Sequence, residues 1–217
     1  MRDATTPRPP YHLVALDLAG RRVAVVGAGQ EAVRRATALL EAGARVELYA
    51  PSEGSVAAFA ARTAVHWFAR PFTPDDARGV VLVLHTDRER DRSVTLRRHA
   101  HATGALFAAV DDPEVSDFIH PAIARRGPVS VAVSTHGQAP ALARVLREAL
   151  DAALDERFVA FADRVAAIRR TTPRERLGER MRELLEGLRI DLRLTLPPWF
   201  TAEGAARPDP YTDTDPR

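Results

Sequence analysis

Three small residues near the start of the sequence have the types and the spacing of a phosphate-binding turn. Gly27, Gly29 and Ala32 form the pattern G-x-G-x-x-A, directly after the apolar run 23–26 and before a helical pattern. In such a pattern the first glycine allows a tight turn, the second lets backbone approach a pyrophosphate, and the third small residue lets helix and strand pack closely. Because a helix start offers unpaired N–H groups and a positive dipole end, the pattern predicts a dinucleotide site. A tight strand–helix turn without a ligand is the alternative.

An acidic residue follows another apolar run and could act as a proton acceptor. Asp111 comes directly after the run 105–110, and in open α/β sheets ligands occupy the crevice beyond the carboxyl ends of the strands. A carboxylate at that place suits general base catalysis. An aspartate that caps the turn before Pro113 would have the same position, so both interpretations stay open, with Asp112 the better candidate for the turn.

The end of the second predicted strand bears on the choice of dinucleotide. The segment ELYAPS lacks the acidic residue that usually holds the ribose hydroxyls at this place. Glu47 alternates within the strand and is assigned to the surface, whereas Pro51 and Ser52 lie where the adenosine ribose would pass. No arginine follows at once to receive a 2′-phosphate, which favours NAD over NADP.

Strands and helices alternate in the first half of the sequence and would position these residues. Apolar runs of strand length, bounded by turn residues, occupy 23–26, 44–51, 64–68, 80–84 and 105–110. A helical pattern over 31–42 places Val33, Ala36 and Leu40 on one face and ends before Gly43, and a second helical stretch ends at Gly104. The alternation predicts an α/β fold, with a Rossmann-like doubly wound parallel sheet over residues 1–112.

The second half of the sequence changes in texture after residue 112. Two short apolar segments around RRGP predict a small β segment over 113–138, and apolar residues at helical spacing predict a helical domain over 139–196. Pro140 suits a first helical position, and Thr172 to Glu175 resemble a capping box before a third helix. Polar, proline-rich stretches predict a loose arm up to Pro10 and a flexible tail over 197–217.

Three apolar stripes are expected in the helical domain, and such stripes are more often core or subunit interface than a cofactor site. They consist of Leu142, Val145, Leu146 and Ala149, then Phe158, Phe161, Val165 and Ile168, then Leu177, Met181, Leu184, Leu185 and Leu188.

Composition excludes several classes of function. Apolar residues make up 46% of the 217 residues and charged residues 28%, as in a folded globular protein. All 31 basic residues are arginine, but the formal net charge is only +2, so nucleic-acid binding is not implied. The lack of cysteine removes disulfides, thiolate metal sites and cysteine nucleophiles. No apolar run reaches signal-peptide or membrane-span length, so we expect a cytoplasmic protein without membrane association.

Further motifs follow the glycine-rich turn in a fixed order. They are V-D-x-P at 110–113, F-I-x-P-A at 118–122 and S-x-x-G-x-x-P-x-L-A-R at 134–144. Together they resemble the siroheme-synthesis family of precorrin-2 dehydrogenases over roughly residues 11 to 165. The resemblance implies a homodimer of three-part subunits, with 113–138 as dimerisation segment, that oxidises precorrin-2 to sirohydrochlorin with NAD. Some members also insert ferrous iron, so Fe²⁺ or Co²⁺ as a further substrate stays open.

The same resemblance assigns roles to single residues. Asp111 matches the family's essential carboxylate, which implies a role as general base. The implied cofactor contacts are Gly27, Gly29, Gln30, Glu31, Ala32, Pro51, Ser52 and Thr86. The substrate is a flat macrocycle rich in carboxylates, which guanidinium groups bind in bidentate geometry. Candidate substrate contacts are Arg125, Arg126, Ser134 and Arg144, although each arginine could equally be a surface charge.

Some residues depart from the family pattern. Ala108 stands where the family usually has asparagine, and His85 where it usually has alanine. Thr135 and His136 replace the commoner serine and glycine. These departures give weight to an alternative, a non-catalytic NAD-sensing or assembly module of the same fold. A third hypothesis is a chelatase for iron or cobalt with His120 or His136 as ligands, but the seven histidines have no metal-site spacing, so no metal ligand is assigned.

Overall fold

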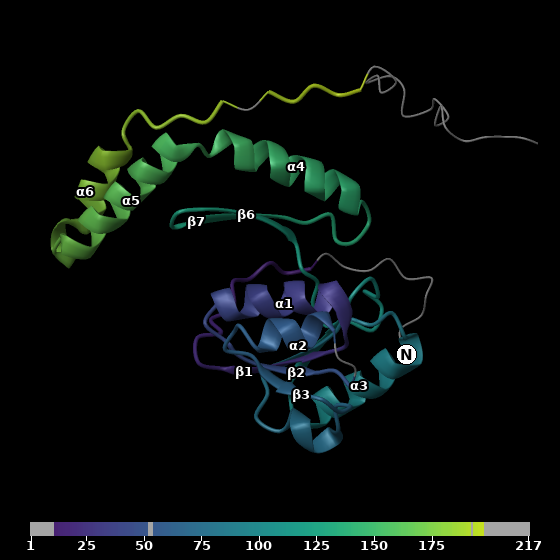
Figure 1. Ribbon diagram of the computed structural model, residues 1–217. Coiled ribbons are helices and arrows are strands. Elements are labelled where there is room, and N and C mark those ends of the chain that lie inside the picture. The colour runs from purple at the N-terminus through teal and green to yellow at the C-terminus, as the bar shows by residue number, and fades with distance from the viewer. Residues whose placement is uncertain (1–10, 52–53, 192, 198–217) are drawn as a thin grey trace, which may run out of the picture. The chain divides into compact units, whose positions relative to one another are not determined.

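A parallel sheet of five strands forms the centre of the N-terminal part of the chain. The computed structural model describes residues 11–51, 54–191 and 193–197. The strands lie in the order β3-β2-β1-β4-β5, and each neighbouring pair is parallel. Figure 1 labels β1, β2 and β3 of this sheet. Their bounds are Arg22–Val26 for β1, Arg45–Tyr49 for β2, His66–Phe68 for β3, Leu82–His85 for β4 and Leu106–Ala109 for β5. The Rossmann-like parallel sheet predicted from the sequence is confirmed.

The strands end level with one another at their carboxyl ends. Val26 at the end of β1 lies opposite Tyr49 of β2 and His85 of β4, and His85 lies opposite Ala109 of β5. From Val23 to Val26 the central strand is fully buried, as expected for a parallel strand that is covered on both faces. The residues that follow these four strands therefore meet at one edge of the sheet.

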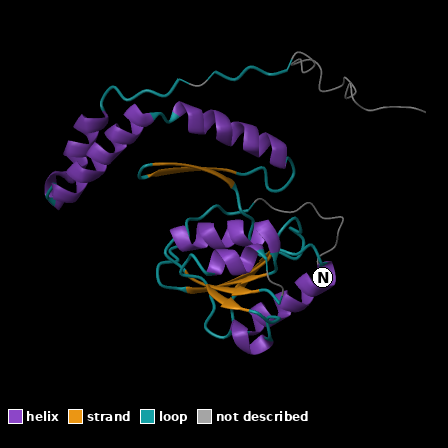
Figure 2. Cartoon of the chain, viewed as in Figure 1, coloured by secondary structure: helices purple, strands orange, loops and turns teal. Residues whose placement is uncertain are grey.

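Helices cover both faces of the sheet (Figure 2). On one face α1 (Gly29–Glu41) and α2 (Ser55–Ala60) pack over a core that includes Val25 and Leu48. On the other face α3 (Arg90–Ala102) and the short 3₁₀ helix η1 (Pro74–Ala77) pack over a core that includes Phe107. The sequence patterns did not predict α2 and η1, which have six and four residues.

The first helix begins two residues earlier than predicted. It starts at Gly29 with Ala28 as its N-cap, and the left-handed Gly43 (φ +77°) follows its C-cap as expected. Its buried face consists of Ala32, Ala36 and Leu39, with the predicted Val33 and Leu40 half-buried beside it. The earlier start places the first-turn amides of the helix within the glycine-rich pattern.

An antiparallel hairpin follows the parallel sheet. Its strands β6 (Ala122–Arg126) and β7 (Val129–Val133) flank the predicted turn, and α4 (Pro140–Ala153) begins at the predicted Pro140 and packs on both strands. Ala143 is buried on α4, whereas Leu142 and Val145 of the predicted stripe are 53% and 56% exposed. Within this chain, therefore, α4 keeps part of its apolar surface uncovered.

The chain divides into two compact units, residues 1–159 and 160–217. The helix α5 (Glu156–Thr171) spans the boundary, and η2 (Arg174–Arg176) and α6 (Leu177–Leu185) follow it. The predicted helical region is thus confirmed, and all four side chains of its second stripe are half-buried. The third stripe is only partly correct, because Leu185 is 42% exposed and Leu188 lies beyond the end of α6. The fourfold division predicted from the sequence, at residues 112, 138 and 196, stays a prediction.

The capping box predicted before the third helix is wrong. The hydroxyl of Thr172 donates to the carbonyl of Ile168 at 2.7 Å, and Pro173, which precedes η2, makes no side-chain cap. The threonine side chain is bonded to the preceding helix, and the N-cap position of η2 belongs to Pro173, whose side chain cannot accept a hydrogen bond. The predicted arm up to Pro10 and the tail from residue 198 onward lie outside the described residues. Among the residues that are described, no helix is both long enough and apolar enough to cross a membrane.

Candidate active site

The glycine-rich turn occupies the edge of the sheet where β1 ends. Gly27 has φ +131°, and a Cβ at this position would meet Thr86 Oγ1 and Asp87 Oδ1 of the loop after β4. Gly29 has φ +79°, and a Cβ there would find no other atom within 4 Å. The two glycines therefore serve different needs: the first allows close packing, and the second allows a left-handed backbone beside open space. Because the N-cap residue Ala28 provides no side-chain cap, the first amides of α1 suit a phosphate ligand.

The loop after β4 packs against the glycine-rich turn and is hydrogen-bonded to it. Thr86 is buried, and its N–H donates to the carbonyl of Val26 at 2.9 Å. Asp87, which the sequence patterns did not single out, accepts a hydrogen bond from the Ala28 N–H at 3.0 Å. The predicted cofactor residue Thr86 thus lies beneath Gly27. Asp87 could have been found by the reasoning that identified Asp111, because it too follows a strand of the same edge.

His85 is a fully buried polar residue at the end of β4. Its Nδ1 lies 2.8 Å from the hydroxyl of Ser93, and its Nε2 lies 4.0 Å from the carboxylate of Asp87. Burial lowers the pKa of His85, so the imidazole is neutral near pH 7. The bulky side chain at this position is therefore accommodated in the core rather than exposed to a ligand.

The first turn of α1 carries a compact charge cluster. Glu31 accepts hydrogen bonds from Arg34 at 2.7 and 2.9 Å and from Arg35 at 2.7 Å. The hydrogen bonds from Arg34, opposed by partial burial and aided by Arg35, lower the pKa of Glu31 to about 2. Of the other predicted cofactor residues on this helix, Gln30 is exposed and Ala32 is fully buried against the sheet.

The carboxyl end of β2 differs from the sequence-based interpretation in one respect. Pro51 is exposed after the strand, and Ser52 lies outside the described residues. Glu47 was assigned to the surface, but its side chain is only 15% exposed. It is paired with Arg22 at 2.8 Å and accepts a hydrogen bond from the hydroxyl of Tyr49 at 2.9 Å, so it belongs to a structural cluster.

Asp111 lies at the same edge, beyond β5. It has a left-handed backbone (φ +59°), and its exposed carboxylate pairs with Arg88 at 2.6 Å. The pKa of Arg34 on α1 is raised, first by the hydrogen bond to Glu31 and least by the charge of Asp111. Asp111 lines an open pocket of about 360 Å³ together with Arg88, Arg90, Ser93, Val110, Asp112, Pro113 and Glu114. The residue therefore occupies a turn and also presents its carboxylate to a pocket.

The four predicted substrate contacts lie on the hairpin, on α4 and in the loop between them. Arg126 pairs with Asp151 at 2.7 Å and so joins β6 to α4, and the hydroxyl of Ser134 accepts a hydrogen bond from the N–H of His136 at 3.1 Å. Arg125 and Arg144 are exposed. No hydrogen bond or ion pair within residues 11–51, 54–191 and 193–197 links any of the four to Asp111.

The two candidate metal ligands, His120 and His136, contact different residues. His136 Nδ1 accepts a hydrogen bond from the Tyr11 N–H at 3.1 Å, and the two rings are stacked. His120 contacts Phe118 edge-on, with ring centroids 5.4 Å apart. In the part of the chain that the structure describes, no three His, Asp or Glu residues form a group that could hold a metal ion.

Comparisons with known proteins agree with this architecture. A family model described as NAD(P)-binding matches residues 14–122, and one described as sirohaem biosynthesis protein central matches residues 126–153. Siroheme synthase of Gluconacetobacter diazotrophicus is 41% identical over 161 residues, which cover 71% of this chain and 33% of the relative. Siroheme synthase 1 of Aeromonas salmonicida is 38% identical over 146 residues, which cover 67% and 31%. The chain thus spans about a third of the length of these curated relatives.

A solved structure shares the fold over most of both chains. The structure titled SirC, precorrin-2 dehydrogenase superposes with a TM-score of 0.68 at 23% identity and covers 82% of this chain and 90% of its own. The first family model covers the parallel sheet with its glycine-rich turn, and the second covers most of the hairpin and α4. The chain belongs to the siroheme-synthesis family, with an NAD(P)-binding domain followed by the central domain of sirohaem biosynthesis proteins.

Proposed function

We propose that this chain oxidises precorrin-2 to sirohydrochlorin with NAD as hydride acceptor, in the synthesis of siroheme or cobalamin. The observation that carries the proposal is the edge of the parallel sheet, where a glycine-rich helix start and the pocket of Asp111 follow strands that end level with one another. Ligands of open α/β sheets bind at such an edge. Kinship with siroheme synthases and the SirC fold supports this choice of substrate.

The residues of the turn fit a dinucleotide. Gly29 leaves open space, and the first amides of α1 point out of an uncapped helix start that favours negative charge. Bound NAD would supply the hydride acceptor. The proposed contacts are Gly27, Gly29, Gln30, Glu31, Ala32, Pro51, Ser52 and Thr86. Among them Gly27, Ala32 and Thr86 act by shaping and supporting the turn, because their side-chain positions are enclosed by neighbouring atoms.

Asp111 is the proposed proton acceptor. Oxidation removes two hydrogens from the macrocycle, one as a hydride that reduces NAD and one as a proton that the carboxylate accepts. Asp111 suits this task because it is exposed at a pocket beside the sheet edge. Arg125, Arg126, Ser134 and Arg144 are proposed as further contacts of the substrate, supported by the affinity of guanidinium groups for carboxylates.

The same proposal includes a homodimer. The exposed Leu142 and Val145 on α4, next to a hairpin of only two strands, would bury their apolar surface against a second copy. The segment 113–138 would then be part of the dimer interface, as the family resemblance implies.

The decisive experiment measures NADH formation from precorrin-2 by absorbance, with the wild type and with Asp111→Asn. General base catalysis contributes roughly 10²- to 10⁴-fold, so we expect kcat to fall by about 10²-fold or more while NAD affinity is kept. Asp112→Asn is the matched control, because the neighbouring carboxylate pairs with Arg90 rather than with Arg88. Full activity of Asp111→Asn would refute the assignment of the base.

Two further outcomes of this experiment would change the proposed function. A wild-type chain that binds NAD but never oxidises precorrin-2 would be the NAD-sensing module instead. Parallel reactions with ferrous or cobaltous ion added test whether the chain also inserts a metal into sirohydrochlorin.

A further inference from the structure

Arginine side chains near Asp111 differ in what they bind. On α1, Arg34 donates two hydrogen bonds to Glu31. In the pocket of Asp111, Arg90 bridges two carboxylates of the loop 112–114, at 3.2 and 2.6 Å. Both guanidinium groups are therefore held by carboxylates that are not proposed to react.

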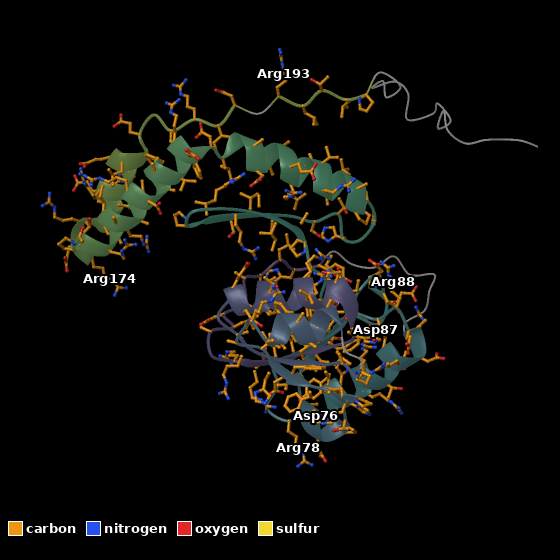
Figure 3. The ribbon with its side chains drawn as sticks, viewed as in Figure 1. Asp76, Arg78, Asp87, Arg88, Arg174 and Arg193 are labelled. Carbon is orange, nitrogen blue, oxygen red and sulfur yellow. The ribbon has the colours of Figure 1, made fainter. Side chains whose placement is uncertain are left out.

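Arg88 differs from these two arginines. Its guanidinium Nη2 lies 2.6 Å from Oδ2 of Asp111, and within the described residues no other ion pair of Arg88 is found. The two side chains are 77% and 62% exposed. Arg88 follows Asp87 on the loop after β4 (Figure 3), so it extends from the loop that supports the glycine-rich turn to the acidic residue beyond β5.

This ion pair conflicts with the proposed role of Asp111. The carboxylate oxygen that faces Arg88 is already occupied by the guanidinium, so the pair must open before this oxygen can meet a proton of the substrate. The pair is also easy to exchange, because two solvent-exposed charges are screened by water and hold each other weakly. A second carboxylate that enters the pocket could therefore replace Asp111 as the partner of Arg88.

We infer that Arg88 binds a peripheral carboxylate of the tetrapyrrole substrate and thereby releases Asp111 to accept the proton. The inference rests on the proposed function and adds the residue that recognises the acidic periphery of the substrate. Arginine suits this role because its planar fork binds a carboxylate with two parallel hydrogen bonds. Arg88 is the arginine of the pocket that pairs with Asp111. If a substrate carboxylate replaces Asp111 at Arg88, Asp111 becomes free to act as the base.

The first test is a kinetic comparison of Arg88→Ala, Arg88→Lys and Arg98→Ala. Loss of the guanidinium should raise KM for precorrin-2 about tenfold or more, with KM for NAD unchanged and kcat within about twofold, because Asp111 is then already free. Lysine should restore part of the affinity, since it keeps the charge but not the fork. Arg98→Ala removes an equal charge from α3, outside the pocket of Asp111, and should leave KM as in the wild type.

The second test is equilibrium binding of sirohydrochlorin, which carries the carboxylates without needing turnover. Asp111→Asn should tighten binding by about two- to fivefold, because it removes the competitor for Arg88. The double variant with Arg88→Ala should lose this gain. Unchanged KM and unchanged sirohydrochlorin affinity in Arg88→Ala would overturn the inference although the wild type oxidises precorrin-2. If the wild type does not oxidise precorrin-2, the proposed function fails, and the binding cycle still decides whether Arg88 holds carboxylates.

Discussion

At Gly27 the backbone and the packing of the site both depend on the absence of a side chain. Its φ of +131° is rare for other residues, and a Cβ would meet Thr86 and Asp87 of the neighbouring loop. The sequence pattern identified this glycine through its spacing, and the structure adds the reason. The loop after β4 lies directly beneath the turn because His85 is in register with Val26.

We predict that Gly27→Ala abolishes tight NAD binding. The methyl group must push the loop or the turn away, so NAD affinity should fall at least about tenfold and stability by about 1–3 kcal/mol. Calorimetric titration with NAD and thermal unfolding measure the two effects. Gly20→Ala is the control, because it has a left-handed backbone (φ +68°) with open space around it and precedes β1 at the opposite edge of the sheet. Wild-type NAD affinity in Gly27→Ala would contradict the proposed site.

For other residues of the site, spacing can suggest a candidate but not its hydrogen-bond or ion-pair partner. Asp111 was found because it follows a strand and matches a motif. Asp87 and Arg88 follow a strand too, but the strand was expected to end at Leu84 and ends at His85. Asp87 contacts Ala28, and Arg88 contacts Asp111. These contacts depend on strand register and on backbone twist, which the spacing of apolar residues does not show.

At the level of secondary-structure elements, one sequence motif occurs twice but forms a capping box at only one of its two sites. Thr-Pro with an acidic residue three positions after the threonine occurs at 73–76 and at 172–175. At the first site Thr73 and Asp76 form a capping box for η1, in which Asp76 accepts a hydrogen bond from the Thr73 N–H at 2.8 Å. Asp76 also accepts a hydrogen bond from the Thr73 hydroxyl at 2.7 Å. At the second site the threonine hydroxyl bonds back to the preceding helix. Apolar runs of strand length predicted the five strands of the parallel sheet. The short helix η1 was not predicted, because it depends on local hydrogen bonds of this kind.

We predict that Asp76→Asn destabilises the parallel-sheet unit by about 1–3 kcal/mol. The carboxylate of Asp76 is largely buried and binds both Nη atoms of Arg70 at 2.7 Å, and the variant loses its charge and this bidentate pair. Hydrogen bonds from Arg70 hold the pKa of Asp76 well below its usual value. A lowered folded-state pKa contributes stability above the unfolded pKa of about 4, and this stability is lost as the pH falls below it. The difference in Tm between wild type and variant should therefore shrink in acid.

Asp75→Asn provides the matched control for this prediction. Asp75 pairs with Arg78, but both side chains are about 80% exposed, so the change should cost no more than about 0.5 kcal/mol. Figure 3 shows Asp76 well separated from Asp87 and Arg88, so NAD affinity should stay unchanged in both variants. An equal loss of stability for the two variants at neutral pH would show that the capping box is not the cause.

At the scale of the whole molecule, the sequence predicted the amphipathic helices but not which of their side chains pack against other elements. The pattern from Pro140 predicted α4 and its apolar residues, but it could not tell which of them face the hairpin. Ala143 is buried, and Leu142 and Val145 are exposed, because the small side chain allows close approach of the helix to the strands. The spacing of apolar residues alone therefore does not show which side chains of such a helix stay exposed.

We predict that Leu142→Arg combined with Val145→Arg converts a dimer into a monomer. Two charges would be placed on apolar surface that the proposed dimer would bury, and burying unpaired charges is strongly unfavourable. Sedimentation equilibrium over a range of concentrations measures the association constant. Val94→Arg is the control, because Val94 is a similarly exposed apolar residue (46%) but lies on α3. A wild type that stays monomeric, or a double variant that associates as tightly as the wild type, would exclude α4 as the interface.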